Sequence, residues 1–471
     1  MLFHTFEYAA FLTVVVWLWY HLAGRQRLAM IVIASYVFYG VWSFRYSLLM
    51  LFSTVLDFYA AREIDASRSA RRRKAFLAAS IIGNLSVLAY FKYTNFALHS
   101  AQSTFAWLGF HVPEVELKLI LPLGISFYTF DEISYTTDVY RRKVKPVPDL
   151  LTMASFVSFF PQLVAGPLQR SWHLVPQLVR EPRFDWLDLR IGVNLILWGL
   201  VKKVVFADNI GAYADAVFAA PEQYSSLATL LGVYAFAFQI YFDFSAYSHI
   251  AMGSAHLLGV RFTKNFDLPY VAEDISDFWR RWHITLSTWL RDYLYVPLGG
   301  SRRGEWRTYV NLLVTMLVGG LWHGANWTFV VWGAYHGGLL ALTRFVKDRF
   351  AGPRAAAAAA TLRPLWIVLT FNLVCVGWVL FRAPTIHAAG GVFRRILWWN
   401  GAALSSDFVW LAVLIAGSFA AHVITAALRP SWGAFMSHAS RRWDVAYACV
   451  VLFLLIVGAS SAITKFIYFE F

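Results

Sequence analysis

Apolar residues along this chain occur in blocks about as long as a membrane-spanning helix. About 20 consecutive apolar residues cross a bilayer as a helix, whereas alternating segments of about ten residues are typical of a lipid-embedded β-barrel. Only the long blocks occur, and they lie at 7–23, 28–44, 47–61, 75–98, 117–137, 189–207, 226–259, 365–384, 407–427 and 445–464. The pattern therefore predicts an all-α polytopic membrane protein with about ten to twelve transmembrane helices.

Two apolar stretches do not fit a single span. Residues 151–168 contain "SFFPQLVAGP", and proline and glycine are tolerated at membrane depth where the backbone is buried in protein, so a re-entrant segment is expected. As one helix, residues 309–342 would measure roughly 50 Å, against a hydrocarbon core of about 30 Å. Both flanks of this second stretch are basic, which predicts entry and exit on one side with a turn near "GGLWHGAN", where His323 lies.

A polar and aromatic stretch follows residue 259. Asp274 and Asp277 resemble a capping box, which opens a helix. The apolar residues of this helix recur at helical spacing, at Phe278, Trp282, Leu286 and Trp289. The pattern predicts an interfacial helix on the cytoplasmic side. The alanine run 355–360 is read as an unconstrained loop, and residues 1–471 are expected to form a single membrane-embedded domain.

Basic residues give the expected orientation of the chain. Lys and Arg collect in cytoplasmic loops, and here they follow the first, third and fifth predicted spans, at 25–27, 68–74 and 141–145. The connection 208–225 has none, as a non-cytoplasmic loop should. The N-terminus is therefore expected outside the cytoplasm, with 7–23 as a retained first span. Arg394 and Arg395 in "FRRILWW" do not fit this count, and an interfacial segment is expected there.

Composition supports the membrane class and excludes nucleic-acid binding. Of the 471 residues, 59% are hydrophobic and 14% are charged, whereas soluble proteins have roughly 25% charged residues. The net charge of +14 would be typical of a nucleic-acid-binding protein, but the basic residues lie in short loops between apolar blocks. The charge is therefore read as a topology signal.

His323 is the strongest candidate for chemistry. An ionisable side chain at membrane depth is a functional hypothesis by default, and burial keeps an imidazole neutral, the form that a general base requires. Asn326 follows three residues later, and Trp322 and Trp327 can form the walls of a pocket. The alternative is a structural histidine that hydrogen-bonds a neighbouring helix.

Other polar residues are weaker candidates. His283, beside Arg280 and Arg281, is either a second group on a substrate path or an interfacial histidine that reaches water. Asp243 and Tyr247, within an apolar span, are read as tunnel lining or, more simply, as structural residues. Asp243 there requires a partner, and Arg280 or Arg291 is a plausible one.

Several chemistries have no support in the sequence. Metal binding is not predicted, because no histidine or cysteine pair has ligand spacing. A phosphate loop and a Gly-x-Ser-x-Gly nucleophile elbow are also absent. In-chain nucleophilic hydrolysis is therefore not expected.

The chain resembles the membrane-bound O-acyltransferase family, in the branch with the alginate O-acetylation membrane protein and the D-alanyl transfer protein of teichoic acid modification. The resemblance covers most of the chain, and its most specific motifs are "DFWRRWHITLSTWLRDYLYVPLGG" and "GGLWHGANWTFVVWGAYHG". It implies a ring of membrane helices around a central tunnel, with His323 as the catalytic histidine and His283 as the second functional histidine. Asp131, Ala246 and His249 depart from the usual family pattern.

The expected function is transfer of an acyl group, most simply acetyl, from a cytoplasmic thioester to an extracytoplasmic polysaccharide hydroxyl. The donor would be acetyl-coenzyme A or an acyl carrier thioester, with Arg280 and Arg281 near the tunnel entrance and Asn326, Trp327, Asp243 and Tyr247 along it. A periplasmic or extracellular acyl-transfer partner is expected, in a bacterial-type inner membrane. D-alanyl transfer to teichoic acid, a transporter and a non-catalytic scaffold for a soluble acetyltransferase remain the alternatives.

Overall fold

The computed structural model describes residues 1–428 except 2, 111, 114, 351 and 353–360, together with residues 451, 455 and 466. Every regular element in this part of the chain is a helix, which confirms the predicted all-α class. The alanine run 355–360 and nearly all of the predicted span 445–464 lie outside the described residues.

Among the described helices, five are long and apolar enough to cross a membrane. They are Gly24–Ala66, Ala70–Trp107, Ser226–Leu257, Arg363–Arg382 and Ser406–Ala427. The predicted total of about ten to twelve spans stays a prediction.

The chain divides into two compact units, each described here by itself. Unit 1 comprises Met1–Ile196 and Ile250–Thr263, and unit 2 comprises Leu197–His249 and Lys264–Phe471. The expectation of a single membrane-embedded domain stays a prediction.

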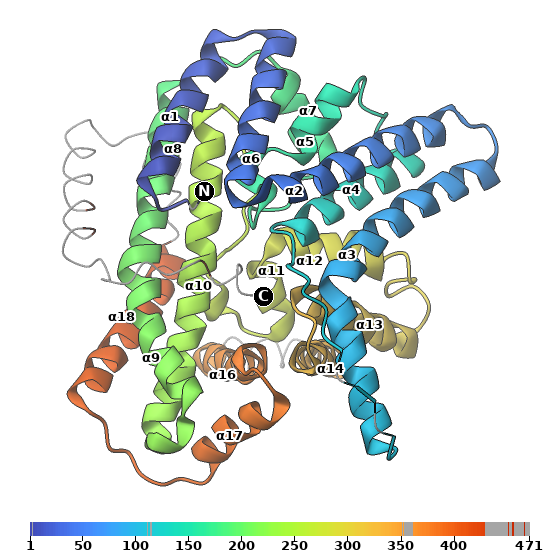
Figure 1. The fold of residues 1–471 in the computed structure, drawn as a ribbon. Helices are drawn as coiled ribbons and strands as arrows, with labels where there is room; N and C mark the ends of the chain where they lie inside the picture. Colours follow the sequence, from blue (N-terminus) through green and yellow to red (C-terminus); the bar gives the residue numbers. More distant parts are fainter. Residues whose placement is uncertain are drawn as a thin grey trace. The chain divides into compact units, whose positions relative to one another are not determined.

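Unit 1 is built from the N-terminal helices (Figure 1). They are α1 (Phe6–His21), α2 (Gly24–Ala66), α3 (Ala70–Trp107), α4 (Ile125–Tyr140), α5 (Leu150–Val157), α6 (Phe160–Leu163), α7 (Ser171–Val179) and most of α8 (Trp186–Leu200). Helix α2 contains the predicted spans 28–44 and 47–61, and the extended backbone of Ser43 separates its two halves. The predicted break between these spans is therefore confirmed within two residues.

Helix α4 corrects the predicted span 117–137, because the backbone becomes helical only at Ile125. Gly124 precedes the helix with φ of +73°, and a Cβ there would lie 2.3 Å from the Leu163 carbonyl oxygen. Only glycine fits such a position. Nearly every α4 side chain is buried, the carboxyl groups of Asp131 and Glu132 included. Protein therefore surrounds α4 on all sides.

The segment 151–168 is interrupted and buried, as predicted for a re-entrant stretch. Helix α5 ends at Val157, α6 contains only four residues, and the side chains from Thr152 to Gln169 are buried. The Phe160 N–H donates to Ser35 Oγ at 3.2 Å, and the Gln162 side chain donates to the Phe156 carbonyl at 2.8 Å. The irregular backbone thus meets its polar partners inside the protein.

Unit 2 begins where α8 continues into the π-helix η1 (Val201–Ala207) and then α9 (Asp208–Ala219). The prediction that 208–225 is a loop is therefore wrong, since only the short connection around η2 (Pro221–Gln223) separates α9 from the next long helix. The remaining elements of the unit are α10 (Ser226–Leu257) as far as His249, η3 (Pro269–Val271), α11 (Ile275–Arg281), α12 (Ile284–Leu290), η4 (Arg291–Tyr295), α13 (Glu305–His323), α14 (Trp327–Arg349), α16 (Arg363–Arg382), α17 (Ile386–Leu397) and α18 (Ser406–Leu428). The end of α10, from Ile250, belongs to unit 1.

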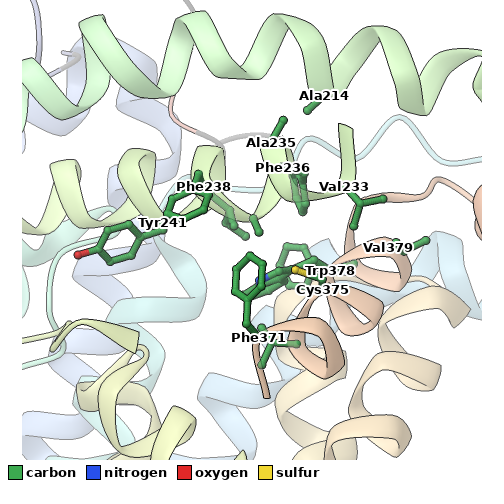
Figure 2. Packing of buried hydrophobic residues seen from close by; sticks show 14 of the residues in the cluster. Ala214, Val233, Ala235, Phe236, Phe238, Tyr241, Phe371, Cys375, Trp378 and Val379 are labelled. Atoms are coloured by element: carbon green, nitrogen blue, oxygen red, sulfur yellow. The ribbon is translucent and has the colours of Figure 1, made fainter. Parts of the chain in front are cut away.

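The core of unit 2 forms mainly between α10 and α16. Figure 2 shows Phe236, Phe238 and Tyr241 of α10 together with Phe371 and Trp378 of α16, and the ring centroids of Phe238 and Phe371 lie 6.1 Å apart. All five side chains are buried. In a membrane, helices associate through close van der Waals packing, so this aromatic layer holds α16 against α10.

Helices α13 and α14 form the hairpin that the length of residues 309–342 predicts. The helical backbone stops at His323 and resumes at Trp327, so the turn lies at the predicted glycine-rich motif. A Cβ on Gly320 would lie 2.2 Å from the Phe329 carbonyl oxygen, and one on Gly333 would lie 2.4 Å from that of Met316. The two backbones can pack this closely only because both positions are glycine.

The segment "FRRILWW" lies mostly in α17, whose charge pattern did not fit the basic-loop count. The Arg395 guanidinium donates to the carbonyl oxygens of Tyr224 at 2.5 Å and Glu222 at 3.0 Å. Arg395 therefore ties α17 to the loop before α10.

Candidate active site

His323 is the last residue of α13, at the point where the hairpin turns. Its side chain is 5% exposed. The imidazole packs edge-on against Trp332 and Phe381, each with ring centroids 5.2 Å away, and against Trp322 at 5.0 Å. The predicted general base therefore lies in an aromatic enclosure drawn from α13, α14 and α16.

His283 lies between α11 and α12 in the left-handed region, with φ of +42°. The prediction of one continuous helix from residue 275 is therefore wrong, because the helix breaks at Trp282 and His283 and restarts at Ile284. A non-glycine residue with such a backbone is uncommon and is a frequent mark of a functional position. Trp282 and His283 are both fully buried.

Trp322 links the two histidines. Its ring centroid lies 5.0 Å from that of His323 and 6.1 Å from that of His283. Phe244 of α10 covers another side of His283, at 4.7 Å. The structure thus brings together the two histidines that the sequence motifs selected, around one indole ring.

His283 is held neutral. It lies outside the candidate membrane spans, and complete burial lowers its pKa to about 3, because desolvation penalises the charged form. Its Nδ1 atom lies 3.2 Å from Oδ1 of Asn265. The neutral imidazole can therefore exchange hydrogen bonds with a reacting group across the whole physiological pH range.

Asp243 has a different partner from the predicted Arg280 or Arg291. Its carboxylate pairs with Lys203 Nζ at 2.8 Å, and the same ammonium group pairs with Asp208 at 2.9 Å. All three side chains are buried. Buried charges must be paired, so this triad joins η1, α9 and α10, and the structural interpretation of Asp243 fits it.

Arg280 and Arg281, which were expected near a tunnel entrance, form ion pairs within α11. Arg281 pairs with Asp277 at 2.8 Å, and Arg280, with a 67% exposed side chain, lies 3.7 Å from the same carboxylate. Asp277 in turn follows the capping residue Asp274, which accepts the Asp277 N–H at 2.9 Å as predicted. Arg280 is accessible to an anionic donor, and its place at a tunnel entrance stays a prediction.

Three other predicted residues have mixed placements. Asn326 is the N-cap of α14, accepting from the Thr328 N–H at 3.0 Å and donating to the Pro384 carbonyl at 2.9 Å. Trp327, the first residue of α14, is 54% exposed. Tyr247 is buried and packs against Phe466. Their role along a tunnel stays a prediction.

His336 is a buried residue that no sequence motif singled out as a candidate. Its Nδ1 accepts a hydrogen bond from the Trp279 indole N–H at 3.4 Å, and its ring packs on Trp332, with centroids 4.8 Å apart. Trp332 also contacts His323. The signal was present in the sequence, since His336 and Trp332 are four residues apart and share one face of a helix.

The arrangement supports acid–base chemistry in an apolar surrounding. Within the described residues, no group of three or more His, Cys, Asp or Glu side chains is arranged to hold a metal ion. What the site offers is two buried imidazoles with aromatic walls. Such imidazoles can move a proton to or from a hydroxyl group.

Fold and site define a class of polytopic helical membrane protein, with one buried histidine at a helix-hairpin turn and a second across a tryptophan ring from it. The sequence model of the membrane-bound O-acyltransferase family matches residues 76–381, which include both histidines. The chain belongs to this family and is an O-acyltransferase, a multi-pass membrane enzyme.

Curated relatives support the same assignment. The chain is 42% identical to the probable alginate O-acetylase of Azotobacter vinelandii over 391 residues, which cover 82% of this chain and 76% of the relative. It is 36% identical to the peptidoglycan O-acetyltransferase of Helicobacter pylori over 406 residues, which cover 79% of this chain and 74% of the relative. It is 26% identical to the teichoic acid D-alanyltransferase of Bacillus subtilis over 283 residues, which cover 57% of this chain and 71% of the relative.

Proposed function

We propose that this enzyme transfers an acetyl group from a cytoplasmic thioester to a hydroxyl group of an extracytoplasmic polysaccharide. The observation that carries the proposal is the placement of His323 and His283 around Trp322 in a buried aromatic site. Greater identity to O-acetylases than to a D-alanyltransferase favours acetyl over D-alanyl.

In the proposed reaction, His323 accepts the proton of the attacking hydroxyl, and the hydroxyl oxygen bonds to the carbonyl carbon of the thioester. The C–S bond then breaks and the ester remains on the acceptor. The departing thiolate takes up the proton held by His323, so that free thiol leaves and the base is restored. His283 positions the donor or assists as a second polar group on the substrate path. The aromatic walls exclude water, which protects the thioester from hydrolysis.

The donor is proposed to be acetyl-coenzyme A or an acyl carrier thioester, with Arg280 and Arg281 at its entrance. The acceptor is alginate, another exopolysaccharide or peptidoglycan, reached directly or through a periplasmic acyl-transfer partner. The proposed location is the bacterial inner membrane. The names of the O-acetylase relatives support this class of acceptor.

The replacement His323→Ala tests the assignment. Loss of a general base costs about 10²–10⁴-fold in rate, so glycan acetylation and thiol release should both fall by that factor at unchanged protein level in the membrane. His387→Ala is a matched control, because this histidine is exposed on α17 and has no place in the proposed site. Wild-type acetylation by His323→Ala would contradict the role of His323 as the base.

Thiol release by purified protein separates the remaining alternatives. An acyltransferase liberates free thiol from acetyl-coenzyme A in the presence of acceptor, whereas a transporter or a scaffold does not. Release from a D-alanyl carrier thioester, with none from acetyl donors, would replace acetylation by D-alanylation.

A further inference from the structure

We infer that Asn265 is a positioning residue that fixes the tautomer of His283, with the proton on Nδ1 and the lone pair on Nε2. This inference deepens the proposed function, since it concerns how the second histidine of the same site is set up for acyl transfer. It rests on the hydrogen bonds of one buried asparagine.

The orientation of the Asn265 amide is set by a group that can only donate. The backbone N–H of Thr285 points at Asn265 Oδ1 from 3.3 Å, and the Thr285 hydroxyl lies 2.9 Å from the same atom. A backbone N–H has no lone pair. The atom that faces Thr285 and His283 must therefore be the amide oxygen.

The other half of the amide agrees with this orientation. Asn265 Nδ2 donates to Ser248 Oγ on α10 at 3.2 Å. The backbone is held as well, because the Ile284 N–H donates to the Asn265 carbonyl at 2.9 Å. Asn265 is 1% exposed, so this hydrogen-bonded clamp is rigid and shielded from bulk water.

The tautomer of His283 follows from the clamp. Its Nδ1 lies 3.2 Å from the amide oxygen, which can only accept, so Nδ1 carries the proton of the neutral ring. Nε2 then presents a lone pair, because a neutral imidazole has one N–H and one acceptor. The hydrogen bond made by one ring nitrogen decides the state of the other.

His336 shows that the site uses both tautomers. Its Nδ1 accepts from the Trp279 indole N–H, which can only donate. The proton of His336 therefore lies on Nε2, the reverse of His283. Each tautomer in this site is thus assigned by a different side chain.

With Nε2 as an acceptor, His283 can take a hydrogen bond from the acceptor hydroxyl or from the amide groups of a pantetheine-type arm. An imidazolium would donate there instead and would repel such a group. The role therefore requires His283 to stay neutral. On the elements packed around His283, the charged side chains of Asp243, Lys264, Asp267, Asp277, Arg280 and Arg281 form ion pairs of their own. The titratable side chains on these elements also include His323, Tyr247 and His249.

The replacement Asn265→Asp tests the inference. Its size is unchanged, but a carboxylate next to Nδ1–H favours the imidazolium and raises the pKa of His283. The rate of thiol release should then fall by about tenfold per pH unit below the raised pKa, giving an acidic limb. Wild-type enzyme, with a neutral His283, should lack this limb between about pH 8 and about pH 6.

One control variant and one further variant of Asn265 isolate the effect. Asn311 is another buried asparagine of unit 2, whose side chain donates to the Gly300 carbonyl at 2.9 Å. Asn311→Asp should lower stability without producing an acidic limb. Asn265→Leu, which can accept no hydrogen bond, should lower kcat by about 10–100-fold, by analogy with residues that orient metal-bound histidines, with donor KM unchanged.

Nitrogen NMR of ¹⁵N-histidine-labelled protein gives a reading that does not depend on activity. The His283 signals, identified by their loss in His283→Gln, should show a protonated Nδ1 in wild type. A protonated Nε2 there, or a pH-independent loss of rate in Asn265→Asp, would overturn the inference. Absence of thiol release by the wild type would instead contradict the proposed function and leave the tautomer measurement intact.

Discussion

At the scale of single residues, Gly377 decides how closely α16 approaches the active-site aromatic cluster. A Cβ at this position would lie 2.5 Å from Nε2 of His336. His336 packs on Trp332, and Trp332 packs on His323. The space beside Gly377 is therefore connected to the proposed base through two ring contacts.

Replacing Gly377 with alanine should reduce both stability and activity. The added methyl group forces His336 to move, and such overpacking costs about 1–3 kcal/mol. The thermal unfolding midpoint and the rate of thiol release should both fall. Gly338→Ala is the matched control, because nothing lies within 4 Å of the new Cβ and helix propensity should stabilise by up to about 1 kcal/mol. Equal behaviour of the two variants would contradict the proposed contact.

The sequence allowed prediction of some functional residues and not others. His323 could be selected because an ionisable residue next to glycines in an apolar block is unusual. The partner of Asp243 was predicted wrongly because Lys203 lies inside an apolar block, and its side chain reaches Asp243 only through the packing of η1 against α10. Such a contact between residues 40 positions apart leaves no local pattern.

At the scale of helices, the turn between α13 and α14 depends on a side-chain cap. Asn326 accepts from the Thr328 N–H and also donates to the Pro384 carbonyl, at the end of α16. Both bonds hold the hairpin turn in place. The position of the hairpin turn then fixes that of His323, the last residue of α13.

The replacement Asn326→Ala should lower the free energy of unfolding by about 1 kcal/mol or more, because the helix loses its N-cap. Asn326→Asp keeps the capping oxygen and should recover most of that loss. The unfolding midpoint in detergent, followed alongside thiol release, measures both. A variant Asn326→Asp with wild-type stability and a large rise in donor KM would favour direct contact with substrate over capping.

Helix boundaries could be predicted where chain length or glycine fixed them. Residues 309–342 are too long for one span, so a turn was required. The break at His283 could not be predicted, because Phe278, Trp282, Leu286 and Trp289 keep a helical period across it. All four are buried, and the left-handed backbone at His283 is maintained by tertiary contacts such as those to Asn265.

At the scale of the whole molecule, the positions of basic residues predict which loops face the cytoplasm. Arg68 lies in the exposed loop between α2 and α3, and Glu222 lies in the exposed connection before α10. The first loop is followed by four basic residues at the start of α3, at 71–74, whereas the second contains no Lys or Arg. They are expected on opposite sides of the membrane.

Cysteine labelling in intact cells tests this orientation. In a Cys449→Ser background, where Cys375 is buried, an impermeant thiol reagent should modify Glu222→Cys from outside. Arg68→Cys should react only in inside-out vesicles. Labelling of Arg68→Cys in intact cells would reverse the predicted topology.

The buried triad around Lys203 also constrains how the chain enters the membrane during synthesis. A lysine at the centre of a helix raises the cost of insertion by the translocon by about 2.5–3.5 kcal/mol, and η1 contains both Lys202 and Lys203. The ion pair of Lys203 with Asp208 offsets part of this cost. The second partner, Asp243, is synthesised 35 residues after Asp208. The segment that contains η1 should therefore wait beside the translocon until α10 emerges, and the two should enter the lipid as a pair.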